Sequence, residues 1–167
     1  MRAMSRQFLE NAFAGESQAH MKYLIFAEVA EKEGKPKIAK LFRAIAFAEL
    51  VHARNHYRAL GGVGNTVENL QKAMDGEKYE IEEMYPVYNA TAKIQGEREA
   101  EKSTYYALSA EKIHFDLYSQ AKKSAEIGKD LDIESVYICP ICGHTAVNEV
   151  PDYCPICGAK RELFVKF

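Results

Sequence analysis

The chain has no tryptophan, only five prolines among its 167 residues, and no cysteine before residue 139. With 47% hydrophobic residues, such a composition excludes a disordered chain and a collagen-like repeat. An excess of one charge is also missing, because 22 basic residues oppose 24 acidic ones; neither nucleic acid nor an anionic membrane is therefore an expected partner. All four cysteines lie in the last 29 residues, which excludes a disulfide miniprotein.

Long apolar runs are absent as well. A membrane-spanning helix needs about 18 or more apolar residues, and the best run, Tyr23 to Ala30, is interrupted by Glu28. The N-terminus has no apolar run followed by a cleavage site of small residues. We therefore expect a cytoplasmic protein without a membrane partner, in a compartment where paired cysteines hold metal more often than they form disulfides.

The first 128 residues have the pattern of helices, because apolar residues recur at every third or fourth position. Four long helices are expected, each ended by glycine, at about 5–33, 36–60, 77–96 (bent at Pro86) and 97–127. The segment 61–76 is predicted to be a connection with one short helix capped by Thr66. The predicted fold is mainly α, a four-helix bundle at residues 1–130 followed by a small β-rich metal domain at 135–167.

Two helices carry the same Glu-x-x-His pattern, Glu49 with His52 and Glu111 with His114. Residues three apart share a helix face, so each pair directs a carboxylate and an imidazole to one place. One such pair is usually an ordinary polar pair in water. Both pairs, however, lie among apolar residues, on stripes without basic partners, where an ionised carboxylate costs several kcal/mol. A bound cation cluster explains them best.

Other carboxylates complete the predicted cluster. Glu16 lies on the expected inner face of the first helix, and Glu77 and Glu80 share a face of the third. One Glu from each of two helices and Glu-x-x-His from the other two is the ligand plan of di-iron and di-manganese bundles. Glu80 is one carboxylate more than that pattern requires, and its spacing leaves open whether it is a ligand, lies beside the ligands or faces solvent. His20 and His56 are expected beside the ligands or in packing, and Glu82 and Glu83 in solvent.

The tail contains two identical knuckles, Cys139-Pro-Ile-Cys142-Gly and Cys154-Pro-Ile-Cys157-Gly. Two Cys-x-x-Cys pairs at this separation place four thiolates around one metal ion. The spacing does not decide between zinc, which would make a structural ribbon, and iron, which would make a one-electron carrier. The side-chain charges of the tail sum to zero, whereas a nucleic-acid-binding ribbon is usually basic.

These segments resemble those of the rubrerythrins over nearly the whole chain: FAGESQAH, AELVHARNH, GEKYEIEEMYP, AEKIH and the CPICG…CPICG tail. The resemblance implies a ferritin-like di-iron bundle, oxo-bridged when oxidised, joined to a rubredoxin-like iron site. It implies that the di-iron ligands are Glu16, Glu49, His52, Glu77, Glu80, Glu111 and His114. Of these, His52 and Glu80 would exchange at one iron. Tyr23 and Tyr85 would lie near the cluster, and the rubredoxin-like iron would be held by Cys139, Cys142, Cys154 and Cys157.

The resemblance further implies a peroxidase that reduces hydrogen peroxide to water and protects an anaerobe from oxidative stress. Electrons would return through the four-cysteine iron from an external donor, such as rubredoxin or an NAD(P)H-dependent reductase. No Gly-x-Gly-x-x-Gly sequence is present, so the chain itself should not bind the nicotinamide. A homodimer is expected, and the connection at 61–76 permits an exchange of helix pairs. Two alternatives remain: a ferritin-like ferroxidase or iron-handling protein, and a zinc-ribbon interaction module on a structural bundle.

Overall fold

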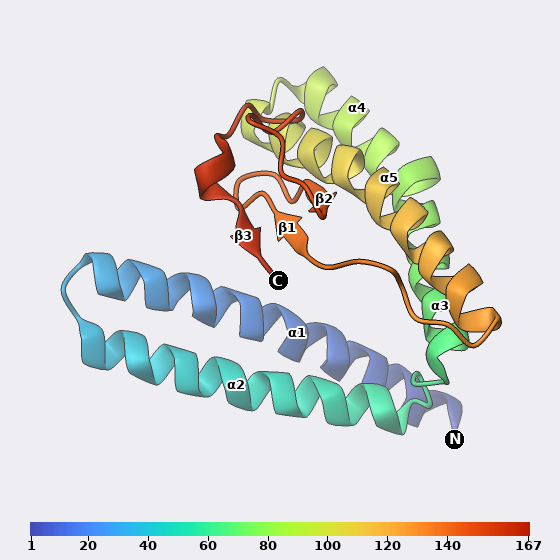
Figure 1. The fold of residues 1–167 in the computed structure, drawn as a ribbon. Coiled ribbons are helices and arrows are strands. Elements are labelled where there is room, and N and C mark those ends of the chain that lie inside the picture. The colour runs from blue at the N-terminus through green and yellow to red at the C-terminus, as the bar shows by residue number, and fades with distance from the viewer. The chain divides into compact units, whose positions relative to one another are not determined.

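Helices form most of the chain in the computed structural model, which describes all 167 residues (Figure 1). The residues divide into two compact units, 1–64 and 65–167, and each is described by itself. The prediction of a mainly α chain with four long helical segments and a small β-rich C-terminal region is confirmed. No helix is both long and apolar enough to cross a membrane.

The first unit is a helical hairpin of α1 (Ala3–Lys32) and α2 (Pro36–Ala59), drawn in blue and cyan in Figure 1. Pro36 occupies the first turn of α2, where its missing N–H costs no hydrogen bond. The two helices meet through small side chains, and Ala27, Ala30 and Ala39 are at most 5% exposed. Alanines at the contact let the two backbones approach closely, with Phe42 packed against them.

Several apolar side chains expected on the inner stripe of α2 are exposed within the hairpin. Leu41 is 61% exposed and Ile45 is 42% exposed, whereas Ala46 is fully buried. The physical reason is geometric: a helix that packs against one other helix covers only one of its sides. The hairpin therefore leaves apolar surface uncovered beside the predicted ligands Glu49 and His52.

The second unit begins with α3 (Thr66–Tyr79) and continues without a break into a π-helical turn (η1, Glu80–Met84) and α4 (Tyr85–Gln95). The third helical segment therefore starts at Thr66, and the expectation of a connection up to residue 76 is wrong. The cap is Asn65, not Thr66. Its side chain accepts a hydrogen bond from the Glu68 N–H, and the Glu68 carboxylate accepts one from the Asn65 N–H. This capping box fixes the start of the helix.

A π-helical turn lies just before Pro86, the residue where a bend is expected. The Tyr85 N–H donates to the Glu80 carbonyl oxygen, five residues back. Proline has no N–H to continue the ordinary ladder, so a widened turn just before it keeps the helical segment continuous. Turns of this kind occur frequently at functional sites, and this one begins at the predicted ligand Glu80.

The last helix, α5 (Arg98–Glu126), packs against α3 and α4, and the C-terminal tail follows it. The tail has three antiparallel strands, β1 (Val136–Ile138), β2 (Thr145–Val147) and β3 (Val165–Lys166), in the order β2-β1-β3. A 3-10 turn, η2 (Arg161–Leu163), precedes β3. The interior of the tail consists of the cysteines with Ala159 and Phe164, and β2 lies against α5.

Candidate metal centres

The first cluster of metal-binding side chains lies in the α1–α2 hairpin. Glu16 of α1 and Glu49 and His52 of α2 bring their ligand atoms within 4.8 Å of one another. His52 Nδ1 lies 3.1 Å from Glu49 Oε2, as the three-residue spacing predicts. A hydrogen bond between the two carboxyl groups raises the pKa of Glu16 and lowers the pKa of Glu49, which His52 lowers further. The two carboxyl groups thus affect each other's pKa in opposite directions.

Two neighbouring side chains of the hairpin, those of His20 and Tyr23, lie outside this cluster. The ring of His20 donates from Nδ1 to the Ala46 carbonyl oxygen at 2.7 Å, so it joins the two helices as a packing residue. The Tyr23 ring packs with Phe26 and Phe42, at centroid distances of 6.2 and 6.3 Å. Tyr23 thus belongs to an aromatic group in the hairpin, and its predicted place near the iron ligands stays a prediction.

The second cluster lies in the other unit and has the same composition. Glu77 of α3 meets Glu111 and His114 of α5, with ligand atoms within 4.8 Å of one another. His114 Nδ1 lies 2.6 Å from Glu111 Oε2 and 4.0 Å from Glu77 Oε1. Burial, the hydrogen bond to Glu111, and the charges of Glu111 and Glu80 raise the pKa of Glu77 to about 8. Glu77 Oε2 is buried without a hydrogen-bond partner. An uncompensated buried acceptor among carboxylates fits a cation.

Glu80 and Tyr85 flank this second cluster without completing it. Burial and the charge of Glu111 raise the pKa of Glu80, and the charge of His114 opposes that shift. Burial and the nearby carboxylates, Glu80 first among them, raise the pKa of Tyr85 and keep its hydroxyl protonated. Glu82 and Glu83 are exposed, as expected. Glu80 thus lies close enough to act on the cluster electrostatically.

The four cysteines of the tail form the third cluster, and none is in a disulfide. Their sulfur atoms lie within 4.8 Å of one another, with 3.5 Å between Cys139 and Cys157 and 3.4 Å between Cys142 and Cys154. Gly143 and Gly158 close the two knuckles at φ of 79° and 76°, a region that side chains disfavour. Burial raises the pKa of the Cys142 thiol, so the thiolate is stable only beside a cation.

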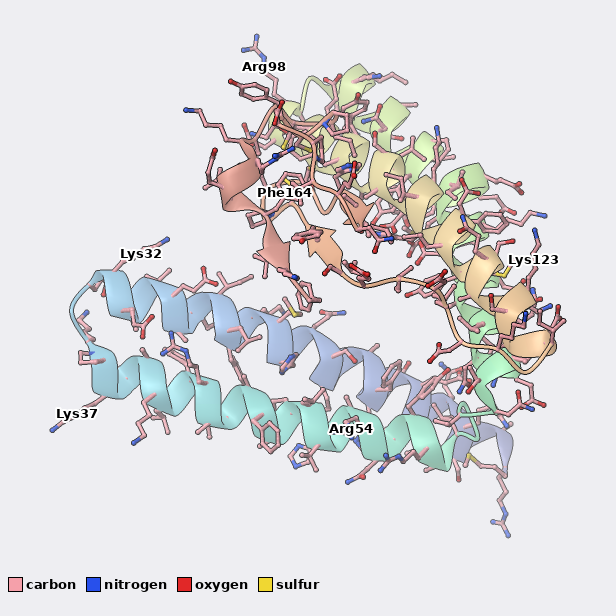
Figure 2. All side chains as sticks on the ribbon, in the orientation of Figure 1. Lys32, Lys37, Arg54, Arg98, Lys123 and Phe164 are labelled. Carbon is pink, nitrogen blue, oxygen red and sulfur yellow. The ribbon has the colours of Figure 1, made fainter.

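Two residues of the tail were missed in the sequence. Thr145, only 6% exposed, places its hydroxyl 2.9 Å from His114 Nε2. His144 is buried against Phe164, which is labelled in Figure 2, and its Nδ1 has no partner. No spacing rule could have found the first contact, because it joins residues 31 positions apart.

Comparison with known proteins identifies relatives of both parts of the chain. The family model described as rubrerythrin matches residues 7–122, and that of the rubrerythrin rubredoxin-like domain matches residues 137–165. Rubrerythrin-2 of Clostridium acetobutylicum is 47% identical over 99% of this chain and 97% of its own. Nigerythrin of Nitratidesulfovibrio vulgaris is 32% identical over 95% of this chain and 84% of its own.

Solved structures of nigerythrin are also similar to this chain. Nigerythrin in a partially reduced state superposes with a TM-score of 0.58 at 31% identity, covering 97% of this chain and 86% of that one. A fully reduced form of nigerythrin, described as all ferrous, matches equally well. The cofactor types predicted from the sequence are confirmed: the Glu/His clusters are ligands of the di-iron carboxylate kind, and the four cysteines form a rubredoxin-like iron site.

Proposed function

This chain belongs to the rubrerythrin family, and from that premise we propose that it is a non-haem di-iron peroxidase that reduces hydrogen peroxide to water. The observation that carries the proposal is the repetition of one cluster, a Glu beside a Glu-x-x-His pair, in both units of the chain. Two such clusters offer the carboxylate-rich, thiolate-free ligands that iron takes in bundle proteins.

The residues proposed to bind the two irons are those of the two clusters together with Glu80: Glu16, Glu49, His52, Glu77, Glu80, Glu111 and His114. Six of the seven are supported by their arrangement in three-residue groups. Glu80 is supported by its electrostatic coupling to Glu111 and His114 and by the π-helical turn that it begins. The exchange of His52 and Glu80 at one iron rests on the resemblance to the family.

Two irons held by these residues would supply the two electrons that reduction of peroxide requires. The chain supplies the protons and their control, since two protons and two electrons convert H2O2 to two waters. Tyr85 keeps its hydroxyl proton because burial and Glu80 raise its pKa. Its O–H can therefore donate a hydrogen bond beside Glu80 without ionising. Glu77, whose pKa is raised to about 8, would release its proton when a cation binds in its place.

The tail is proposed to return electrons one at a time to the peroxide site. Its four clustered sulfurs suit iron, three of the four cysteines are buried, and Tyr106 of α5 packs against them. The donor to the tail would be rubredoxin or an NAD(P)H-dependent reductase. Protection against oxidative stress in an anaerobe is the role that this chemistry fits, and cysteines kept as thiolate ligands fit the cytoplasm.

A homodimer is part of the proposal. The hairpin exposes large apolar side chains, among them Phe26, Leu41 and Ile45, and uncovered apolar surface of this extent favours association. Sedimentation of the iron-loaded chain should give twice the monomer mass of 18.9 kDa. A monomer at micromolar concentration would exclude this part of the proposal.

Two other functions remain as alternatives, and one experiment separates them. Metal analysis is combined with the anaerobic oxidation of a reduced donor on addition of H2O2. The peroxidase predicts three irons per chain and donor oxidation that requires peroxide. A ferroxidase predicts rapid oxidation of added Fe²⁺ by O2 in a large assembly. A zinc-ribbon module predicts a colourless protein and no donor oxidation, and this result would refute the peroxidase.

A further inference from the structure

The tail makes one polar contact with the Glu77–Glu111–His114 cluster. Thr145, the first residue of β2, places Oγ1 2.9 Å from Nε2 of His114. The contact is enclosed, since Thr145 is 6% exposed and the His114 side chain 26% exposed. Gly143 lies beside the contact, where an added Cβ would stand 3.8 Å from the Ala110 Cβ of α5. The small residues Ala110 and Gly143 thus let β2 approach the helix face that carries His114.

The neighbours of this hydrogen bond allow the direction that suits a metal-binding histidine. The Thr145 hydroxyl also lies 3.3 Å from the Gly143 carbonyl oxygen, which can only accept a hydrogen bond. The Gly143 carbonyl oxygen can take the single hydroxyl proton, which lets the Thr145 oxygen present its lone pairs to His114. In this arrangement Nε2 of His114 carries a proton and donates it. The other ring nitrogen, Nδ1, faces the Glu111 carboxylate at 2.6 Å, a separation that needs a proton or a cation between the two atoms.

We propose that Thr145 is a positioning residue of the metal site: its hydroxyl fixes the ring of His114 with Nε2 protonated and Nδ1 directed at the metal. A histidine binds metal through the nitrogen that lacks a proton, and a partner on the other nitrogen fixes the tautomer and the ring orientation. This inference rests on the proposed role of His114 as an iron ligand. It adds that the tail takes part in building the carboxylate site, besides holding its own iron.

The test uses the full-length chain with iron already in the four-cysteine site. Co²⁺ is added under argon as the probe, and its binding by the carboxylates and histidines is followed by its absorption. Thr145→Val removes the hydroxyl and should weaken Co²⁺ binding about tenfold or more, the usual loss when a partner of a ligating histidine is removed. Thr145→Ser keeps a hydroxyl and should restore the affinity. Thr91→Val, at an exposed position of α4, is the matched control.

A second readout is independent of metal at the carboxylates. The Nε2 proton of His114 should exchange slowly with solvent in the wild-type and Thr145→Ser chains, and quickly in Thr145→Val, as measured by nitrogen-resolved NMR with zinc in the four-cysteine site. Should Thr145→Val lose the absorption of the tail iron, Thr145→Ala takes its place. If wild type and variant show equal Co²⁺ affinity and equal protection of the His114 Nε2 proton from solvent exchange, the role of Thr145 alone would be overturned. A wild-type chain whose carboxylates bind no Co²⁺ would overturn the proposed function itself.

Discussion

Glu111 and His114 lie one turn apart on α5, and their side chains meet at 2.6 Å between Oε2 and Nδ1. Glu49 and His52 repeat the relationship on α2 at 3.1 Å. In each case one carboxylate from the neighbouring helix, Glu77 or Glu16, completes a group of three. The chain thus builds the same ligand group twice, from two different pairs of helices.

Among the proposed ligands, Glu80 is expected to be needed for peroxide turnover and not for retention of the two irons. Glu80→Ala should leave the three-residue clusters intact and retain two irons, because six other ligands remain. Peroxide turnover should fall by at least tenfold, since the residue proposed to exchange at one iron is gone. Iron analysis and donor oxidation on the same sample measure both effects. Glu83→Ala, at an exposed neighbouring position, is the control; unchanged turnover in Glu80→Ala would remove Glu80 from the mechanism.

The buried carboxyl of Glu77 predicts how the metal-free chain responds to pH. Its pKa is raised to about 8 in the fold, from 4.5 in a solvated chain, so the folded state holds the extra proton between these values. Stability therefore falls as pH rises from 5 to 8. Thermal unfolding of metal-free protein should show this decline, and Glu77→Gln should reduce it, while Glu83→Gln leaves it unchanged. Equal slopes for all three chains would contradict the burial of an uncompensated carboxyl at Glu77.

Loss of a tail cysteine should stop donor-dependent turnover while the carboxylate irons stay bound. Cys142→Ser removes one sulfur from the tail cluster, so the tail iron should be lost and one iron per chain should disappear. The carboxylate irons should remain, because none of their ligands changes. Donor-dependent turnover should then stop, although a small chemical reductant still allows a single reaction with peroxide. Full turnover with the biological donor would show that electrons bypass the tail.

Alanine substitutions at two glycines of the hairpin unit should change the stability of the chain in opposite directions. A Cβ at Gly62 would overlap the ring of Tyr57 at Cζ, and that ring packs with Phe13 at 5.1 Å. Gly62→Ala should therefore destabilise the chain by about 1–3 kcal/mol, as overpacking does. Gly15 lies inside α1 with nothing within 4 Å of an added Cβ. Gly15→Ala should stabilise by about 0.5–1 kcal/mol. Urea unfolding measures both, and a neutral Gly62→Ala would show that Tyr57 moves freely.

Local patterns predicted much of the fold and of the site. Glycines marked the helix ends, and three-residue spacing was enough to pair Glu49 with His52 and Glu111 with His114, because a helix has a fixed pitch. The knuckles of the tail likewise follow from Cys-x-x-Cys with a following glycine. These features depend on neighbours within a few residues.

Features that depend on competition or on distant contacts could not be predicted. Asn65 and Thr66 are both good caps, and only the reciprocal bonds with Glu68 decide between them. Pro86 indicated an irregular helix, but a bend and a π-helical turn both satisfy its missing N–H. The exposure of Leu41 and the contact of His114 with Thr145 are set by which elements pack together, and helix periodicity carries no information on that.

The peroxidase proposal requires that the reduced chain reacts with peroxide in preference to dioxygen. This preference is measured by stopped-flow mixing of the fully reduced, iron-loaded protein with H2O2 or with O2 at equal concentration. We expect oxidation by H2O2 to be at least tenfold faster than oxidation by O2, with one H2O2 consumed per pair of carboxylate irons. Oxidation by O2 at an equal or greater rate would exclude the peroxidase and favour the ferroxidase.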